Sequence, residues 1–443
     1  MRKFTLIWIG QLVSTVGSYM TSFALTLWVW SLTESTTALA LVSFFWLLSR
    51  ICISLIAGTI VDRINRKYLI ILGDAIVASS TLGLLILYSS ENLAIWHLYV
   101  AAGIKGSFGQ IQELAYAASI TLLVSPKDYT RASSMGTSIH YGSSIFAPAI
   151  AGVLYPVIGL GGILPIDLVT FVVAISTVLW LKIPQAGSES KHSQRDTGTE
   201  DTERTEETVK ANSLSLTKLT ILWDELTFGI KYIWQRDSLR TLMLITALFW
   251  FAHDLGGAIS NPMILARSNN NSQVLGAISS AAGIGGVTSA VVLTVWGGTK
   301  RRINSMLTGF MGAGIAKTVF GLGQSVTVWL PAQFCSSLNF PLLGSAEAAL
   351  WMDAISPELQ GRVFAANSLG LQLVSAIATL IAGPLSDFVL EPAMRSQRLP
   401  FAPIFGHGAG AGMALLYVFC AIVMCFTGAV GYRLPQLSRL EDS

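Results

Sequence analysis

Charged residues are scarce in this sequence. Asp, Glu, Lys and Arg make up 12% of the 443 residues, whereas they make up about 25% of an average soluble protein. Hydrophobic residues account for 52%, and the mean hydropathy is +0.60. Because globular domains could not bury so much apolar surface, lipid must cover much of it. The composition therefore predicts an integral membrane protein and excludes a string of soluble domains.

Signatures of enzymes and of nucleic-acid binding are also missing. The net charge is only +3 and is dispersed, which argues against a nucleic-acid partner. The sequence contains no nucleotide-binding loop, metal-ligand cluster or nucleophile–base signature, so we expect no enzyme activity and no bound cofactor or metal. The cysteines lie in apolar runs and are predicted to be buried thiols rather than a disulfide framework: Cys52, Cys335, Cys420 and Cys425.

Long apolar runs dominate what is present. A membrane core of about 30 Å requires about 20 apolar residues per helix. The first six such runs lie near 5–30, 37–60, 69–89, 94–122, 136–158 and 163–183. The second six lie near 240–264, 274–297, 305–323, 327–353, 363–388 and 409–432. The sequence therefore predicts an all-α membrane protein with twelve transmembrane helices.

Basic residues in the loops predict the orientation, because cytoplasmic loops carry an excess of Lys and Arg. With the N-terminus inside, and the central segment left out, thirteen basic residues fall in cytoplasmic loops. Only Arg267, Arg395 and Arg398 fall outside. We therefore expect a multi-pass protein of the cell membrane with both termini in the cytoplasm.

The composition changes between the sixth and seventh runs. Residues 185–213 hold seven acidic and four basic residues and almost no apolar ones, which is typical of a disordered linker. After it, apolar residues share one helical face and predict an amphipathic helix at the membrane interface: Leu219, Leu222, Leu226, Ile230 and Ile233. The predicted organisation is a six-helix half (1–183), a cytoplasmic linker (184–218), an interfacial helix (219–239), a second six-helix half (240–433) and a cytoplasmic tail (434–443).

The two halves repeat one another at an offset of 231 residues. The matched pairs are Ser125 and Ser356, Pro126 and Pro357, Arg131 and Arg362, and Gly152 and Gly383. Two parallel six-helix halves are the architecture of major facilitator transporters, in which the substrate binds between the halves near the membrane midplane. Alternating access by rocking of the halves is expected from that architecture.

A loop motif points to the same family. Residues 58–67, Gly-Thr-Ile-Val-Asp-Arg-Ile-Asn-Arg-Lys, resemble the major facilitator motif Gly-x-x-x-Asp-Arg-x-Gly-Arg-Lys/Arg, with Asn65 at the usual glycine. Asn tolerates a left-handed backbone better than most residues, so we expect the turn to survive. The resemblance implies a conformational latch that favours the outward-open state, although the cations also satisfy the positive-inside rule. Its residues are Gly58, Asp62, Arg63, Arg66 and Lys67.

Other segments resemble the drug-exporting branch of this family, which includes macrolide and siderophore exporters. Two of them are Trp8-x-Gly10-Gln11 in the first run and Asp167-x-x-Thr170-Phe171 in the sixth. In the fifth run, Gly142, Pro148 and Gly152 partly match the exporter motif Gly-x-x-x-Gly-Pro-x-x-Gly-Gly, with Ala147 and Ala151 at two of its glycines. Small residues at such positions let helices approach closely.

Ionisable residues inside the membrane are costly and usually mark transport or coupling sites. In the fourth run, one helical face carries Lys105, Gly109, Gln112, Glu113 and Tyr116, so this face lines a cavity or packs on another helix. Glu113 is the predicted proton-coupling carboxyl group, because loss of water favours its neutral form. The alternative is a static ion pair, for which Arg50 is a candidate cation. Lys105-x-x-x-Gly109 resembles the Arg-x-x-x-Gly motif that the family links with proton transfer.

The second half supplies Asp254, which is predicted to be a second proton site, a substrate contact or a structural partner of Lys317. Asp74 and Asp167 are predicted to be structural, and Glu347 could bind a cationic ligand. The residues predicted to line a substrate cavity are Gln11, Ser14, Ser18, Gln112, Tyr116, Asn261 and Glu347. An apolar and aromatic cavity with a few polar groups suits amphipathic organic molecules.

These observations predict a secondary transporter that exports amphipathic drug-like compounds, secondary metabolites or siderophores by proton antiport. Two alternatives stay open: a proton-coupled importer of a small nutrient, and a transport-inactive homologue that acts as a sensor. The expected partners are a small-molecule substrate, protons and the lipid bilayer, and the chain is expected to be a monomer.

Overall fold

The computed structural model describes residues 2–125, 128–180, 227–299, 301–396, 401–406 and 408–441. These residues form helices and short connections, and no strand occurs among them. The predicted linker over 184–218 and the first part of the interfacial helix, 219–226, lie outside the described residues.

The first half consists of five continuous helices: α1 (Arg2–Thr33), α2 (Thr36–Arg63), α3 (Arg66–Ser89), α4 (Ile95–Leu123) and α5 (Tyr129–Trp180). Helix α5 contains two predicted spans. A straight helix of 52 residues would be about 78 Å long at 1.5 Å per residue, far more than the membrane core. The chain breaks at Gly159, whose φ of 60° and ψ of −168° suit glycine alone. This break separates the two spans.

The second half begins with α7 and ends with α14: α7 (Asp237–Arg267), α8 (Ser272–Trp296), α9 (Arg302–Leu322), α10 (Val326–Asp353), α11 (Pro357–Pro384) and α14 (Ala411–Gly431). Helix α11 continues into a π-helical segment, η2 (Leu385–Leu390), and then into α12 (Glu391–Arg395). The short helices α13 (Ala402–Phe405) and α15 (Pro435–Ser438) flank α14.

The twelve predicted spans are confirmed as helices. Among the described residues, nine segments are long and apolar enough to cross a membrane, and one of them, Ser138–Trp180, holds two spans. The remaining two spans are α4 and α10, the fourth helix of each half, which are less apolar than the others. The all-α membrane fold therefore agrees with the sequence.

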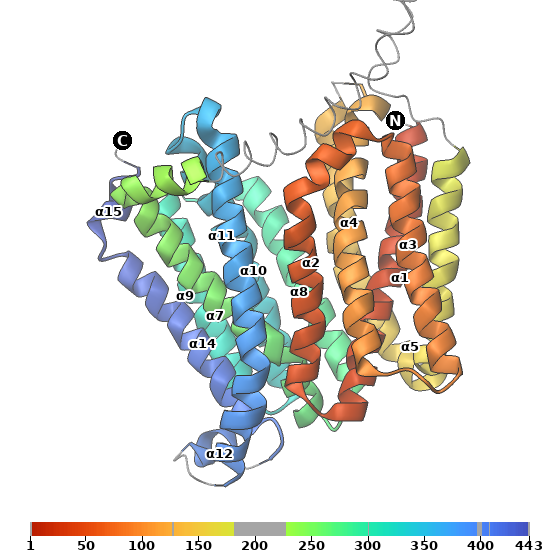
Figure 1. The fold of residues 1–443 in the computed structure, drawn as a ribbon. Coiled ribbons are helices and arrows are strands. Elements are labelled where there is room, and N and C mark those ends of the chain that lie inside the picture. The colour runs from red at the N-terminus through yellow and green to blue at the C-terminus, as the bar shows by residue number, and fades with distance from the viewer. Residues whose placement is uncertain are drawn as a thin grey trace, which may run out of the picture.

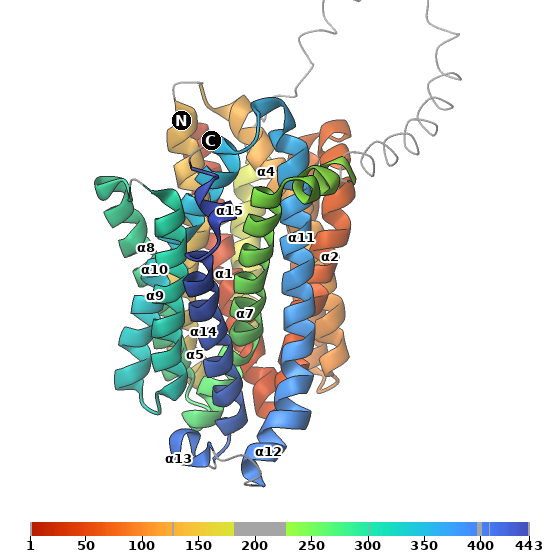
Figure 2. The same ribbon diagram turned by 90° about the vertical axis from the view of Figure 1, so that its left-hand side faces the viewer.

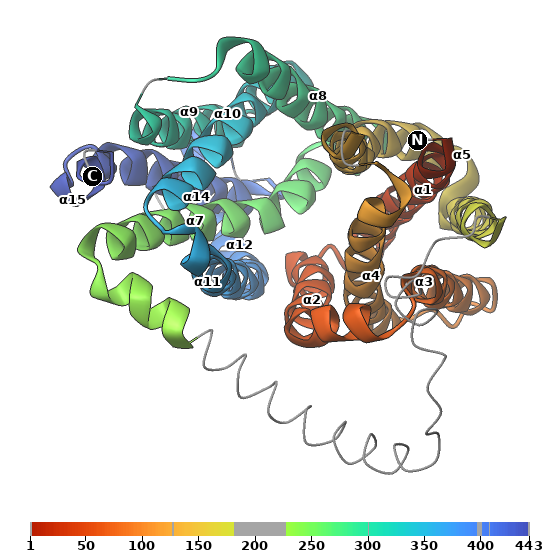
Figure 3. The ribbon, with the colours of Figure 1, turned by 90° about the horizontal axis from the view of Figure 1, so that it is seen from above.

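The helices form two bundles that lie side by side (Figure 1). Both termini lie on the same face, here called the terminal face, and the opposite face is called the far face (Figure 1). Seen from above, α1 to α5 form one group, and α7 to α11 with α14 form the other (Figure 3). The bundles pack on one another through α5 with α8 and through α2 with α11.

The seam between α5 and α8 depends on two glycines. A Cβ at Gly152 would lie 2.8 Å from the Ser272 carbonyl oxygen, and a Cβ at Gly276 would lie 2.6 Å from the Pro148 carbonyl oxygen. The Ser272 hydroxyl donates to the Gly152 carbonyl at 2.9 Å. Close approach of two helices through small residues is therefore present, as the fifth-run motif predicted. Gly142 makes no such contact, since a Cβ there would lie 3.9 Å from Leu12.

The seam between α2 and α11 is closed by Asp387 in η2. Its carboxylate accepts hydrogen bonds from the Ser35 hydroxyl at 2.8 Å and from the backbone amides of Thr37 at 2.8 Å and Thr36 at 3.2 Å. A carboxylate from the second half thus caps the N-terminus of α2 in the first half, where it meets the positive end of the helix dipole. Both seams lie toward the far face, because α2 and α8 begin there and α11 ends there.

Residues 227–235 are helical and belong to the segment that the sequence predicts to be an interfacial helix. It lies across the terminal-face end of α11 (Figure 2), where a Cβ at Gly229 would lie 2.6 Å from the Arg362 carbonyl oxygen. The Arg362 guanidinium lies 5.8 Å from the Phe228 ring centroid. Ile233 is fully buried, whereas Ile230 is 50% exposed. The helix therefore attaches to α11 and leaves part of its apolar face uncovered.

Two details differ from the sequence prediction or add to it. Cys52 and Cys335 are exposed rather than buried, because the outer surface of a membrane protein is itself apolar. The predicted tail packs on the second half: Leu437 is buried, and Glu441 accepts a hydrogen bond from the Ile303 amide at 2.9 Å.

Candidate functional site

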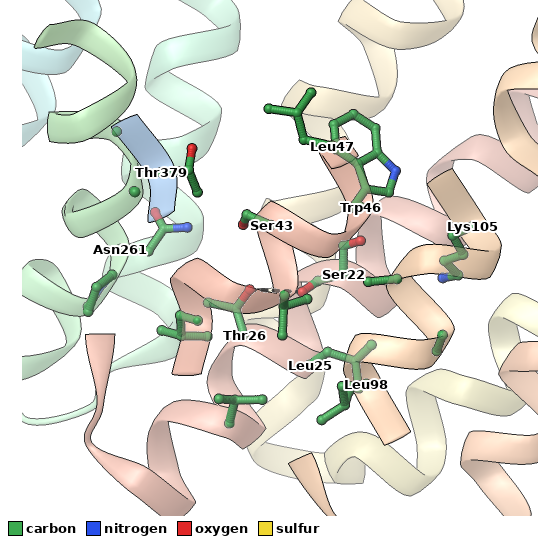
Figure 4. A pocket seen from close by; sticks show the side chains of 18 of the residues that line it. Ser22, Leu25, Thr26, Ser43, Trp46, Leu47, Leu98, Lys105, Asn261 and Thr379 are labelled. Atoms are coloured by element: carbon green, nitrogen blue, oxygen red, sulfur yellow. Dashed lines mark hydrogen bonds between the residues drawn. The ribbon is translucent and has the colours of Figure 1, made fainter. Parts of the chain in front are cut away.

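A cavity of about 420 Å³ lies between the two halves, and we call it the deep cavity. Helices α1 to α4 line it from one side, and α7 and α11 from the other. Most of its wall is apolar. Its polar and aromatic lining residues are Ser22, Thr26, Ser43, Trp46, Lys105, Asn261, Ser375 and Thr379. Figure 4 shows several of them.

A second cavity of about 590 Å³ adjoins the deep cavity, and we call it the vestibule. Trp46 and Lys105 line both cavities, so the two are neighbours. The other polar residues of the vestibule are Gln11, Thr15, Arg50, Gln112, Glu113, Tyr116 and His140. All of its lining residues belong to the first half, and they lie on α1, α2, α4 and the first part of α5, nearer the terminal face than the deep cavity. The vestibule therefore extends the deep cavity toward the terminal face.

An ion pair stands on the vestibule wall. Arg50 on α2 donates from Nη2 to Oε2 of Glu113 on α4 at 2.9 Å. The two side chains are 31% and 43% exposed, and the Arg50 guanidinium lies 5.4 Å from the Trp46 ring centroid. The candidate cation weighed from the sequence is therefore the one that pairs with Glu113. Opposite charges that pair in this way lower the cost of placing either inside a membrane.

From the vestibule wall inward, three side chains form a hydrogen-bonded row across α4, α1 and α3. Gln112 donates from Nε2 to Oε1 of Gln11 at 2.9 Å. Gln11 in turn donates from Nε2 to Oδ2 of Asp74 at 3.0 Å. Gln11 and Asp74 are each 6% exposed. Gly73 permits this close packing, because a Cβ there would lie 2.6 Å from the Gln112 Cβ.

Two residues predicted to line the cavity lie elsewhere. Ser18 donates to Oδ1 of the fully buried Asp167 at 3.2 Å, and Ser14 is buried. Neither is among the residues lining the two described cavities. The physical reason is that α1 packs along α5, so this stripe of α1 faces the interior of the first half. Lys105, by contrast, lines both cavities and interacts electrostatically with Asp167.

The candidates from the second half separate into two groups. Asn261 lines the deep cavity, and Asp254 lies beside it, within hydrogen-bonding reach of the lining residue Ser375. Lys317 acts on Asp254 electrostatically, but its amino group donates to the Tyr417 hydroxyl at 3.1 Å.

Glu347 is 9% exposed, has Trp250 as a hydrogen-bonding neighbour, and does not line either described cavity. The predicted cavity role of Glu347 is therefore not supported in this conformation, because its side chain is buried next to Trp250 of α7.

The loop motif organises the terminal-face end of the first half. Arg66 donates to the Ala118 carbonyl at 2.6 Å, and Lys67 donates to the Leu179 carbonyl at 3.0 Å. Arg63 is exposed, and no atom lies within 4 Å of a Cβ placed at Gly58. The side chain of Asp62 lies outside the described part of the chain.

Asn65 does not adopt the left-handed backbone that its position in the motif suggested. Its φ is −56°, and its side chain accepts a hydrogen bond from the Lys67 amide at 3.0 Å. The turn therefore needs no glycine, because Asn65 acts as the N-cap of α3.

The chain belongs to the Major Facilitator Superfamily, because it matches the sequence profile of that family over residues 7–379. It is 26% identical over 390 residues to macrolide efflux protein A of Streptococcus pyogenes, a match that covers 87% of this chain and 89% of the relative. It is 22% identical over 390 residues to the uncharacterized MFS-type transporter YfiS of Bacillus subtilis, with 86% of each chain covered.

Solved structures show the same fold. A bacterial homologue of the human lysosomal transporter Spinster, described as inward-facing and unoccupied, matches with a TM-score of 0.70 at 14% identity, covering 99% of this chain and 97% of that one. A bacterial homologue of the iron transporter ferroportin, described as inward-facing, matches with a TM-score of 0.65 at 16% identity and 98% coverage of each chain. The protein is thus a multi-pass membrane protein of a transporter family rather than an enzyme, and the macrolide efflux relatives support the exporter-like branch.

Proposed function

We propose that this protein exports amphipathic organic compounds from the cell by proton antiport with alternating access. The observation that carries the proposal is the arrangement of the two cavities. The deep cavity is shared by both halves beneath the closed seams of the far face, and it adjoins a vestibule that carries the Arg50–Glu113 ion pair. A substrate held there touches both halves, so their relative movement can change the side from which it is reached.

The wall of the deep cavity supports an amphipathic substrate. Apolar side chains make up most of it, and a few hydroxyl and amide groups supply hydrogen bonds. Cavities of this kind bind organic molecules through apolar contact and use a small number of polar groups for orientation. The macrolide efflux relatives support compounds of that class, and siderophores stay within the proposal.

A proton-coupling role for Glu113 would act through its ion pair with Arg50, which otherwise serves as the static pair that the sequence offered as the alternative. Protonation would remove the negative charge of Glu113, break its attraction to Arg50 and leave an unbalanced cation on the vestibule wall. Such a change would alter both the binding free energy of a substrate in the cavity and the free energy of closing the vestibule. Asp254 beside the deep cavity is a second candidate, and Lys105, which lines both cavities, supplies fixed positive charge.

The excess of basic residues in the loops supports the orientation with both termini in the cytoplasm. In that orientation the two seams would close the outer side, and the vestibule would extend the deep cavity toward the cytoplasm. This is the state in which an exporter takes up its substrate.

The test is uptake of the macrolide erythromycin by inside-out membrane vesicles with and without a proton gradient. We expect uptake that stops when an uncoupler collapses the gradient, and we expect Glu113→Gln to lower it by about tenfold or more, as loss of a proton-transfer group does. Asp353→Asn is the matched control, since Asp353 pairs with Arg302 and lines neither described cavity. Full gradient-driven uptake in Glu113→Gln would refute the site, and transport in the opposite direction would identify an importer.

A further inference from the structure

Asp74 is a buried carboxyl group that the proposed function does not use. It lies on α3 in the interior of the first half and is 6% exposed. Its described hydrogen bond comes from Gln11, and no ion pair with a cation joins it in the described part of the chain. A buried carboxylate without a cation is costly inside a membrane, whereas the neutral acid is tolerated. Asp74 is therefore a group that can hold a proton.

The row formed by Asp74, Gln11 and Gln112 connects this buried group to the vestibule. Gln11 and Gln112 both line the vestibule, and Gln112 is the end of the row that is further from Asp74. In the structure, each amide nitrogen donates toward Asp74. The side-chain carbonyl oxygen of Gln112 takes no part in the row. It can therefore accept a hydrogen bond from a group in the vestibule.

We propose that Asp74 is a second proton-binding site and that Gln11 and Gln112 relay its state to the substrate cavity. The neutral acid is a hydrogen-bond donor. When Asp74 donates to Gln11, the Gln11 amide must turn its oxygen toward Asp74 and its nitrogen toward Gln112. Gln112 must then turn its oxygen toward Gln11 and present its N–H groups to the vestibule. One proton on Asp74 therefore converts the vestibule wall at Gln112 from an acceptor into a donor.

Neighbouring titratable groups do not occupy this site. Helices α4 and α5 pack against α3, and α1 supplies Gln11. The titratable side chains that these helices place in the membrane interior include Tyr19, Lys105, Glu113, Tyr116, His140, Tyr155 and Asp167. In the described ranges none of them forms a hydrogen bond or ion pair with Asp74: Glu113 pairs with Arg50, and Asp167 accepts from Ser18.

The consequence for transport rests on the proposed function. A substrate that binds through a hydrogen-bond donor would favour the state in which Gln112 accepts, and a proton on Asp74 would weaken its binding. Proton and substrate would then compete without sharing one position, which is what antiport requires. The expected effect is a change of about fivefold to tenfold in affinity, which corresponds to one hydrogen bond.

The first experiment needs no substrate. Infrared difference spectra of the purified full-length protein in lipid, taken between alkaline and acidic pH, should contain the C=O band of a protonated buried carboxyl group. We expect that band to vanish in Asp74→Asn and to persist in Asp167→Asn, the matched control for a buried carboxyl group that is not bonded to a glutamine. A carboxyl band that persists unchanged in Asp74→Asn would overturn the proposal.

The second experiment tests the relay. Side-chain amide signals of Gln11 and Gln112, observed by NMR after ¹⁵N-glutamine labelling, should shift with the same midpoint as the carboxyl band. Gln11→Met should preserve the Asp74 band but abolish the shift of Gln112. A shift of Gln112 that survives in Gln11→Met, or no shift in the wild type, would rule out the relay.

Erythromycin binding separates this inference from the proposed function. One outcome supports both proposals: the infrared and NMR results hold, and the erythromycin affinity of the wild type changes with pH. In Asp74→Asn the affinity should then change with pH by less than about twofold. If the spectra hold but no gradient-driven transport of the probe occurs, the proposed function fails while the proton site stands. If transport is proton-driven and equally pH-dependent in Asp74→Asn, the coupling role of Asp74 fails alone.

Discussion

Asn65 occupies the position at which the major facilitator loop motif carries glycine, and here it caps α3 with its side chain. Because its φ is −56°, the backbone gains nothing from the freedom of glycine. We expect Asn65→Ala to lower stability by about 1 kcal/mol through loss of the cap, and Asn65→Gly to lower it by only a few tenths. Thermal unfolding in detergent measures both variants. An unchanged unfolding temperature in Asn65→Ala would show that the side-chain cap contributes nothing, because this variant lacks the capping oxygen.

Single residues also show what the sequence can and cannot predict. The polar face of α4 was recognisable from its spacing, and Arg50 could be named as a partner for Glu113 because few cations lie inside the membrane. The row from Gln112 to Asp74 was not recognisable. It joins three helices, and a sequence specifies which residues share a face but not which faces of separate helices meet.

At the scale of elements, the seam between α5 and α8 is held by backbone contacts that allow no side chain. Replacing Gly152 by Ala places a methyl group 2.8 Å from the Ser272 carbonyl, and replacing Gly276 by Ala crowds the Pro148 carbonyl. We expect either variant to push the helices apart and to open the far face. Overpacking of this kind costs about 1–3 kcal/mol, which would raise the population of the open state by about fivefold to a hundredfold.

Access to a reporter cysteine measures this opening. Ser22→Cys in the deep cavity, in a protein without its native cysteines, should react faster with a membrane-impermeant thiol reagent applied from the far face. Gly142→Ala is the matched control on the same helix, because its Cβ would make only ordinary contact with Leu12. Equal reaction rates in Gly152→Ala and Gly142→Ala would contradict the seam.

The positions of the helices were largely predictable from the sequence. The irregular segments that connect helices, and their contacts with the other half, were not. Apolar runs located all twelve spans to within a few residues, because lipid imposes both length and composition on a crossing helix. The π-helical segment after α11 had no local signal. It positions Asp387 against a helix of the other half, and that contact joins residues about 350 positions apart in the sequence.

At the scale of the whole molecule, Asp387 is the charged link between the halves on the far face. Glu391, one turn later, accepts a hydrogen bond from the Met413 amide at 3.1 Å and so caps α14 within its own half. We expect Asp387→Ala to release α2 and to shift the protein toward a state open on the far face. Glu391→Gln should lower thermal stability without moving the halves, because the bond it weakens joins two parts of one bundle.

Spin labels at the exposed positions Leu32 and Phe388, one in each half, report this movement as a distance distribution. The expected outcome is a longer distance in Asp387→Ala and an unchanged one in Glu391→Gln. An unchanged distribution in both variants would mean that the seam between α5 and α8 alone keeps the far face closed. The sequence predicted the two-half architecture but not this closed state, because both states bury nearly the same helices and differ in a few contacts between them.

Helix α4 holds polar groups of the vestibule and helix α10 holds the buried Glu347, and both helices are less apolar than their neighbours. A charged residue at the centre of a helix opposes its entry into lipid during synthesis. Each of these helices therefore depends on a companion that arrives before or with it, and α3 and α9 pack directly on them. We therefore expect the fourth helix of each half to enter the bilayer together with the helix that precedes it, because that helix packs directly on it and covers its polar residues.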